Sequence, residues 1–305
     1  MTDEAKGVLA MIGACTIWGL SGIYYKQLDH VPAIEILCHR TFWGLFFFIC
    51  VLLYQGRLPL LPAAMATRRS FAIIVLAAFV ISLNWFVFIS SIQLGHATDA
   101  SLGYYIFPLA AVLLGAIFYR EKLNRAQLIS VGLATCAVVV LSVGLQVTPW
   151  VALVLAVSFG MYGVIKKSLS TGPVVSVTAE VAMLTPFALG WLAMTHARGD
   201  GHFGTDLVTS LMLAFAGILT AIPLILFSYA TRRVSLATVG LVQYLNPTLQ
   251  FLVATLIFRE AFTLWHAIAF AMIWTALAIY TASSLRRGRA ARKAARAAGM
   301  SGTVI

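Results

Sequence analysis

The sequence predicts an all-α integral membrane protein with ten transmembrane helices, arranged as two inverted five-helix repeats. Three observations support this fold class: the composition, a series of long apolar stretches, and a duplication of the chain. Hydrophobic residues make up 61% of the 305 residues and charged residues 10%, whereas soluble domains carry about 25% charged residues. The mean hydropathy is +0.94. This composition excludes an ordinary soluble domain.

Apolar stretches of roughly 20 residues follow one another along the chain, and each is long enough to cross a hydrocarbon core about 30 Å thick. The first stretch lacks a small-residue cleavage site and is followed by nine more, so we interpret it as a helix and not as a removed signal peptide. The predicted helices are 6–27, 33–54, 70–94, 98–119, 126–146, 149–168, 174–196, 207–230, 234–258 and 262–284.

The second half of the chain repeats the first at a nearly fixed offset. We divide the chain into a first repeat, 1–147, a second repeat, 148–285, and a basic tail, 286–305. Five helices per repeat is an odd number, so the second copy is predicted to be inverted in the membrane, as in many secondary transporters. Pairs that differ by 139 positions are Tyr105/Tyr244, Pro108/Pro247, Arg120/Arg259 and Glu121/Glu260.

The positions of Lys and Arg predict the orientation. If the N-terminus is cytoplasmic, Lys26, Arg198 and Arg259 fall outside, Arg40 lies within a helix, and the other seventeen of the 21 fall inside. By the positive-inside rule both termini are then cytoplasmic, and we expect a multi-pass protein of the bacterial inner membrane. The net charge of +11 therefore does not indicate nucleic-acid binding. The tail is expected to lie against anionic lipid headgroups.

The sequence contains no pattern that indicates a cofactor, a metal or a disulfide framework. The cysteines lie inside predicted helices without CxxC spacing, and we interpret them as small apolar residues. A Walker motif is also absent, so an ATP-driven pump is not predicted. The four cysteines are Cys15, Cys38, Cys50 and Cys136.

Prolines occupy equivalent positions inside the predicted fourth and ninth helices. Pro108 and Pro247 each remove a backbone hydrogen bond and favour a kink. Because the pair occurs in both halves, we predict that these residues are hinges for gating. Pro223 lies in the eighth helix without such a pairing, and there a simple tolerance of proline in membrane helices explains it equally well.

The second helix carries the most unusual polar residues. Glu35, His39 and Trp43 are spaced four residues apart and share one face, with Arg40 beside them. Arg40 lies about 10 Å into the helix, so it needs a partner, and Glu180 in the seventh helix is the predicted one. Two interpretations remain open: a structural ion pair that joins the halves, or a role in substrate or proton binding. His39 is the predicted residue for proton coupling.

Other predicted helices carry polar and aromatic residues at helical spacing. As a set they suit a cavity for a small amphipathic solute, although each residue alone is explained equally well by hydrogen bonding between helices. Together with His39, Arg40, Trp43 and Glu180, the predicted substrate-binding residues are Trp18, Asn84, Trp85, Tyr104, Tyr105, Tyr162, Gln243, Tyr244 and Asn246.

Several of these segments resemble the drug/metabolite transporter superfamily, in its EamA branch, and in particular the RarD group of permeases. The resemblance covers roughly residues 5–285 and implies ten helices in two inverted repeats. One departure is Phe107-Pro108, where the family has Asn-Pro, so the first-half cavity is expected to be more apolar. The residues that carry the resemblance are Trp18-Gly19, Val31–Leu37, His39-Arg40, Trp43, Asn84-Trp85, Gly95-His96, Ala100–Tyr104, Ser158–Gly163, Gln243-Tyr244 and Pro247–Phe251.

The resemblance implies a transporter of small metabolites, often an exporter. We predict a secondary transporter that moves a metabolite, an amino acid-like or a drug-like solute by alternating access, as a monomer or a weak dimer. A flippase for a lipid-linked metabolite is the alternative. An intramembrane protease is a further one, because Gly19-Leu20-Ser21-Gly22 matches a rhomboid signature. Its serine would lie in the wrong helix, however, and is not repeated in the second half, so we expect no enzyme.

Overall fold

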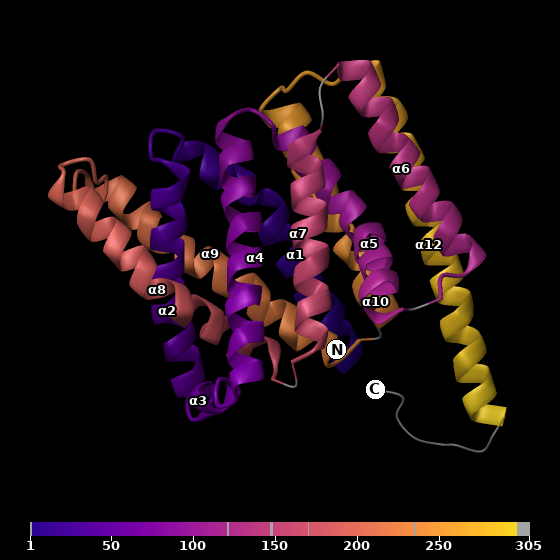
Figure 1. The fold of residues 1–305 in the computed structure, drawn as a ribbon, viewed down its shortest axis with the longest axis horizontal. Helices are drawn as coiled ribbons and strands as arrows, with labels where there is room; N and C mark the ends of the chain where they lie inside the picture. Colours follow the sequence, from indigo (N-terminus) through magenta and orange to yellow (C-terminus); the bar gives the residue numbers. More distant parts are fainter. Residues whose placement is uncertain (1, 121, 147–148, 170, 235, 298–305) are drawn as a thin grey trace.

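The computed structural model describes residues 2–120, 122–146, 149–169, 171–234 and 236–297, and the regular elements of these residues are all helices (Figure 1). The first half contains α1 (Asp3–Gln27), α2 (Ala33–Tyr54), α3 (Leu60–Ala64), α4 (Arg68–Gln93), α5 (Ala97–Tyr119) and α6 (Arg125–Leu145). The second half contains α7 (Trp150–Lys167), α8 (Pro173–Ala197), α9 (Leu207–Thr231), α10 (Leu236–Gln243), α11 (Leu245–Leu252), the π-helical η1 (Val253–Ile257) and α12 (Leu264–Ala297).

In the described part of the chain, eight helices are long and apolar enough to cross a membrane: α1, α2, α4, α5, α6, α8, α9 and α12. The protein is therefore a multi-pass membrane protein. The predicted helix 149–168 corresponds to the shorter α7, and the predicted helix 234–258 is divided into α10, α11 and η1. α3 was not predicted, and the last predicted helix ends at residue 284, whereas α12 continues to Ala297. Residues 298–305 of the predicted tail lie outside the described residues.

The division between α10 and α11 has a local cause. A proline ring clashes with the carbonyl four residues earlier, which for Pro247 is the carbonyl of Gln243, and α10 ends at Gln243. The equivalent Pro108 has a different outcome, because α5 runs without interruption from Ala97 to Tyr119. The two prolines of the predicted hinge pair are thus accommodated differently in the two halves.

Arg120 and Arg259 share an uncommon backbone conformation. Their φ angles are 54° and 55°, in the left-handed region that non-glycine residues seldom adopt. Arg120 is the C-cap of α5, and Arg259 directly follows the end of the ninth predicted segment at Phe258. The repeat detected in the sequence therefore ends both segments with the same local geometry.

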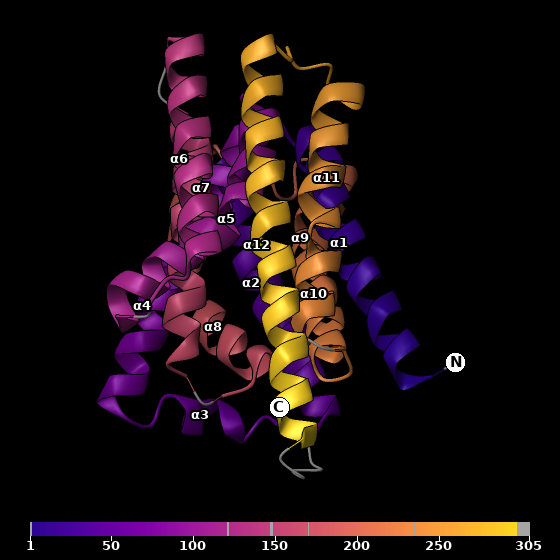
Figure 2. The same cartoon turned by 90° about the vertical axis from the view of Figure 1, so that its right-hand side faces the viewer.

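Most of the extensive helix packing joins the two halves of the chain. α5 packs on α7, α2 on α8 and α9, α1 on α9, and α4 on α7. α6 and α12 pack on each other at one edge of the molecule (Figure 1), and Figure 2 shows α12 between α6 and the α10–α11 segment. The core of the protein is consequently shared between the halves, and polar residues buried there contact both.

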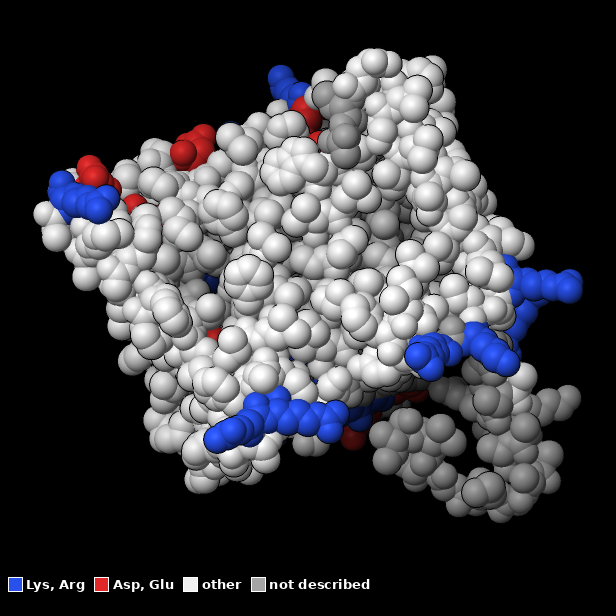
Figure 3. All heavy atoms as spheres, in the orientation of Figure 1, with Lys and Arg blue, Asp and Glu red and all other residues white. Residues whose placement is uncertain are grey.

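The two ends of the helix bundle differ in charge. Most Lys and Arg side chains on the face shown in Figure 3 lie along its lower edge, the edge at which α3 lies in Figure 1. Arg57 and Arg68 flank α3 in the sequence, and Arg57 and Arg232 both lie beside Gly172. We call this the basic end. The opposite end carries the connections after α1, α4, α8 and η1.

Close approach of α2 and α9 yields a stability prediction. A methyl group on Gly217 would collide with backbone atoms of Trp43 and Gly44, whereas a methyl group on Gly44 would have Gly217 Cα as its nearest neighbour at 4.0 Å. We expect Gly217→Ala to destabilise the protein by about 3 kcal/mol and Gly44→Ala to leave it unchanged. Thermal unfolding of both purified variants in detergent measures this, and equal midpoints would contradict the packing described here.

Candidate functional site

Asn84, at the centre of α4, connects the two halves by hydrogen bonds. Its Nδ2 donates to Ser158 Oγ at 2.9 Å and to the carbonyl of Leu155 at 3.1 Å, both on α7. Its Oδ1 accepts a hydrogen bond of 2.9 Å from the Tyr104 hydroxyl on α5. The Asn84 side chain is fully buried, and a buried amide is retained at low cost only when it is satisfied in this way. These bonds fix the position of Tyr104.

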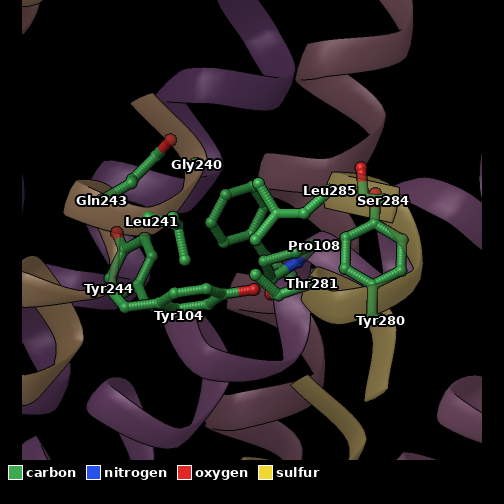
Figure 4. Close-up of a pocket in the computed structure, with 11 residues that line it drawn as sticks. Tyr104, Pro108, Gly240, Leu241, Gln243, Tyr244, Tyr280, Thr281, Ser284 and Leu285 are labelled. Carbon is green, nitrogen blue, oxygen red and sulfur yellow. The ribbon is translucent and has the colours of Figure 1, made fainter. Parts of the chain in front are cut away.

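The other side of Tyr104 lines a cavity of about 180 Å³ between α5, α10 and α12 (Figure 4). The cavity lies toward the basic end, because Leu285 directly precedes Arg286 and α10 follows Arg232 and Arg233. Its lining combines aromatic rings with hydroxyl and amide groups, as in sites for small amphipathic solutes. The lining residues are Tyr104, Phe107, Pro108, Gly240, Leu241, Gln243, Tyr244, Tyr280, Thr281, Ser284 and Leu285.

A second cavity of about 350 Å³ adjoins the first and shares Leu241, Tyr244 and Thr281 with it. Tyr105 and Trp274 lie on its other side, with their ring centroids 6.1 Å apart. The Tyr105 hydroxyl is 2.7 Å from Thr248 Oγ1. Tyr104 and Tyr105, adjacent on α5, therefore face two neighbouring cavities at the junction of the halves.

Arg40 lines neither of these two cavities. Its side chain is buried, its Nη1 donates to the Tyr25 hydroxyl on α1 at 3.0 Å, and its guanidinium carbon lies 4.1 Å from the centroid of the Trp85 ring on α4. A guanidinium over an aromatic face is a favourable cation–π arrangement. The prediction that Glu180 is the partner of Arg40 was wrong. Among the described residues, these two side chains form no ion pair.

Glu180 is held instead by residues of its own half. Lys166 Nζ lies 2.5 Å from Glu180 Oε1, and the Tyr162 hydroxyl donates to Oε2 at 2.9 Å. Lys166 also donates to Ser176 Oγ. Because α7 and α8 are joined by a short connection, the long lysine side chain reaches the buried carboxylate of its neighbour. Lys166 is one of the seventeen charges predicted on the cytoplasmic side, but its side chain is only 19% exposed.

At the opposite end, Glu35 contacts the segment before α9. The Glu35 carboxylate accepts a hydrogen bond from the backbone N–H of His202 at 2.7 Å and lies 2.8 Å from His202 Nδ1. Phe203 then stacks on His39 with a centroid distance of 4.9 Å. At the end of this segment, Asp206 caps α9, and the hydrogen bond from Thr209 N–H lowers the pKa of the Asp206 carboxyl group below its ordinary value.

Two more side chains, those of Glu260 and Gln93, connect helices at the same end. Glu260 accepts hydrogen bonds of 2.7 Å from the backbone N–H groups of both Ala97 and Thr98, the first residues of α5. A carboxylate at a helix N-terminus satisfies free donors and is favoured by the helix dipole. Gln93, at the end of α4, donates to the carbonyls of Leu28 and Val31 at 2.9 and 2.8 Å.

The family of the chain follows from its sequence matches. The profile of the EamA-like transporter family matches residues 5–143 and again residues 148–282. The chain belongs to the EamA-like transporter family. It is a membrane transporter, and the expected resemblance to the RarD group is confirmed by its curated relatives.

Curated relatives match almost the whole chain. An uncharacterized transporter of Vibrio cholerae is 41% identical over 96% of this chain and 97% of its own. The protein RarD of Streptomyces exfoliatus is 40% identical over 95% of this chain and 92% of its own, and RarD of Escherichia coli 35% identical over 94% and 98%. A crystal structure aligns with a TM-score of 0.58 at 19% identity over 92% of this chain and 98% of its own, which shows a similar fold.

The predicted site residues of this EamA-like transporter fall into several groups. Tyr104, Gln243, Tyr244 and Pro108 line the first cavity, with Asn84 one hydrogen bond away, and Tyr105 joins Tyr244 in the second cavity. Arg40 contacts Trp85, and Tyr162 contacts Glu180. His39 and Trp43 both lie against Phe203. Trp18 packs on Phe227, Asn246 Oδ1 accepts from Gln250, and Pro247 is buried in α11.

Four residues outside the predicted set also contribute to this arrangement: Tyr25, Ser158, His202 and Lys166. No signal in the sequence identifies the partners of Tyr25 and Ser158, which only tertiary contacts show. His202 lies between the predicted helices 174–196 and 207–230, where the sequence does not indicate a contact with Glu35. Across the described residues, no group of three or more His, Cys, Asp or Glu side chains is placed to hold a metal ion.

Proposed function

We propose that this protein is a secondary transporter that moves a small organic solute across the bacterial inner membrane by alternating access. The observation that carries the proposal is the cavity of about 180 Å³ between α5 of the first half and α10 and α12 of the second. A solute bound there touches both halves, so relative movement of the halves changes its access. Tyr104 links this cavity to the buried Asn84–Ser158 contact between the halves.

The transporter acts with ten membrane-crossing segments in two inverted five-helix repeats, with both termini in the cytoplasm. The shared backbone geometry of Arg120 and Arg259 supports the repeat, and the positive-inside rule supports the orientation. The basic end is then cytoplasmic. The contacts of Glu35, Gln93 and Glu260 at the opposite end support a conformation that is closed to the outside. Export then requires these three contacts to open.

Counterflow in proteoliposomes against a panel of amino acids and metabolites tests this proposal. Gly240→Trp is expected to abolish uptake, because Gly240 lines the cavity and has no atom within 4 Å of an added Cβ. Gly132→Trp is the matched control: Gly132 has the same free space but lies exposed on α6, so uptake should persist.

The same vesicles separate the remaining alternatives. An imposed pH gradient tests proton coupling, for which His39 is the proposed residue, and the sidedness of uptake tests the export direction. Movement of a fluorescent lipid without movement of any solute would replace the transporter proposal with a flippase. Equal uptake by the two tryptophan variants would place the solute path outside this cavity.

A further inference from the structure

Polar nitrogen atoms that lack hydrogen bonds are concentrated on one part of α2. Of the buried side-chain atoms for which the described residues provide no hydrogen-bond partner, four nitrogens belong to three neighbouring residues: His39 Nδ1 and Nε2, Arg40 Nε and Trp43 Nε1. His39 and Arg40 are 5% and 6% exposed. Positions 39, 40 and 43 lie within about one turn of α2; Arg40 contacts Tyr25 and Trp85, and His39 and Trp43 lie against Phe203. Buried polar groups are normally satisfied, and this local excess requires an explanation.

Arg40 is the unusual member of this cluster. A guanidinium carries five N–H donors and a permanent charge, yet the hydrogen bond to Tyr25 and the contact with Trp85 are the interactions that the structure shows for it. Two buried acids, Glu35 and Glu180, could in principle neutralise it, but both have other partners. Glu35 binds His202 and also lies 4.0 Å from His39 Nε2, and Glu180 binds Lys166 and Tyr162. A cation buried in the hydrocarbon region without a counter-ion is a functional candidate.

The surroundings define the anion that would fit. A guanidinium binds a carboxylate through two parallel hydrogen bonds, and a single fixed cation balances a monoanion and not a phosphate dianion. The indole N–H of Trp43 and an N–H of His39 would add neutral donors. An ammonium group on the same solute would lack a free partner here, because Glu35, the acid beside His39, is already bound by His202.

The apolar side of the cluster indicates the rest of the solute. Trp43 also lines a groove of about 720 Å³ between α1, α2 and α9, in which Tyr24, Phe47 and Phe215 provide further aromatic surface. Phe203 lies over His39 and Trp43, with centroid distances of 4.9 and 6.2 Å. An aromatic or aliphatic body would be desolvated there, next to the donors of α2.

We infer that Arg40, with His39 and Trp43, binds the carboxylate of the transported solute, and that the solute class is a small monocarboxylic acid with an apolar body and no free amino group. This inference rests on the proposed transport function and specifies its substrate. Arg40 then serves as a binding residue in the second helix, reached from the cavity near Tyr104 as the halves move.

Counterflow with three matched probes tests the inference: phenylacetate, its neutral amide phenylacetamide, and zwitterionic phenylalanine. Wild-type protein is expected to move phenylacetate at least tenfold faster than either of the others. Arg40→Gln should remove this preference, and Arg40→Lys should retain part of it because the charge remains. Arg69→Gln, which removes an exposed charge in the first turn of α4, is the matched control and should behave as wild type.

A binding measurement keeps the test decisive if Arg40→Gln folds poorly. Phenylacetate, but neither phenylacetamide nor chloride, should raise the melting temperature of the wild-type protein in detergent, because a ligand stabilises the state that binds it. Equal rates for acid and amide, or stabilisation by chloride alone, would overturn the carboxylate assignment while leaving transport intact. Failure of every solute in the wider panel would instead overturn the proposed function itself.

Discussion

Lys166→Met is expected to destabilise the protein by about 3–5 kcal/mol, the usual range when one member of a buried ion pair is removed. Glu180 is fully buried, and Lys166 Nζ lies 2.5 Å from its carboxylate. Without Lys166, the hydroxyl of Tyr162 is the remaining side-chain donor to Glu180 among the described residues. One neutral hydrogen bond does not compensate a carboxylate in an apolar bundle. The measurement is thermal unfolding of the purified variant in detergent.

The double variant Lys166→Met/Glu180→Gln is the control for this prediction. It removes both charges and keeps an amide that can still accept from Tyr162, so most of the lost stability should return. A methionine is similar in length to the apolar part of a lysine. The substitution therefore removes the charge and keeps most of the packing. A loss below about 1 kcal/mol in the single variant, within the range of an exposed pair, would show that the Lys166–Glu180 contact is not a buried ion pair.

The sequence predicted the helices well because each is a long apolar stretch between polar residues. α2 begins and ends at the predicted residues, 33 and 54, and most other ends agree to within about two residues. The interruption at Gln243 was not predictable in the same way. Pro108 and Pro247 are equivalent in the sequence, yet only the second coincides with a break, because the surrounding packing decides whether a helix continues through a proline.

The partners of the buried charges were harder to predict. The depth of Arg40 in its helix could be counted from the sequence, but the direction of its side chain and the identity of the facing helix could not. Glu180 was a plausible partner for Arg40 because of its depth in the membrane. In the structure, Glu180 pairs instead with Lys166 from the adjacent helix. His202 shows the same limit: a residue in a connection can fold back onto a buried carboxylate 167 positions away.

Glu260→Gln is expected to open the end of the bundle opposite the basic end. The carboxylate of Glu260 receives the N–H groups of Ala97 and Thr98 at 2.7 Å each and so joins the end of the ninth segment to the start of α5. A glutamine presents one acceptor and turns an NH₂ group toward the second N–H. Loss of a charge-assisted hydrogen bond costs about 1.5–3 kcal/mol, which corresponds to a shift of roughly tenfold to 100-fold in the ratio of closed to open states.

Cysteine accessibility measures this shift directly. Ala100 is fully buried one turn into α5, so Ala100→Cys, in a protein whose four native cysteines are replaced by alanine, reports on opening of that end to a membrane-impermeant maleimide. Adding Glu260→Gln should raise the labelling rate at least tenfold. Asp29→Asn removes an exposed acid at the same end, paired with Lys26 at the surface, and should leave the rate unchanged. If both variants behaved alike, the loss of negative charge, and not the contact with α5, would explain the result. Equal labelling of all three proteins would mean that the Glu260 contact does not hold this end closed.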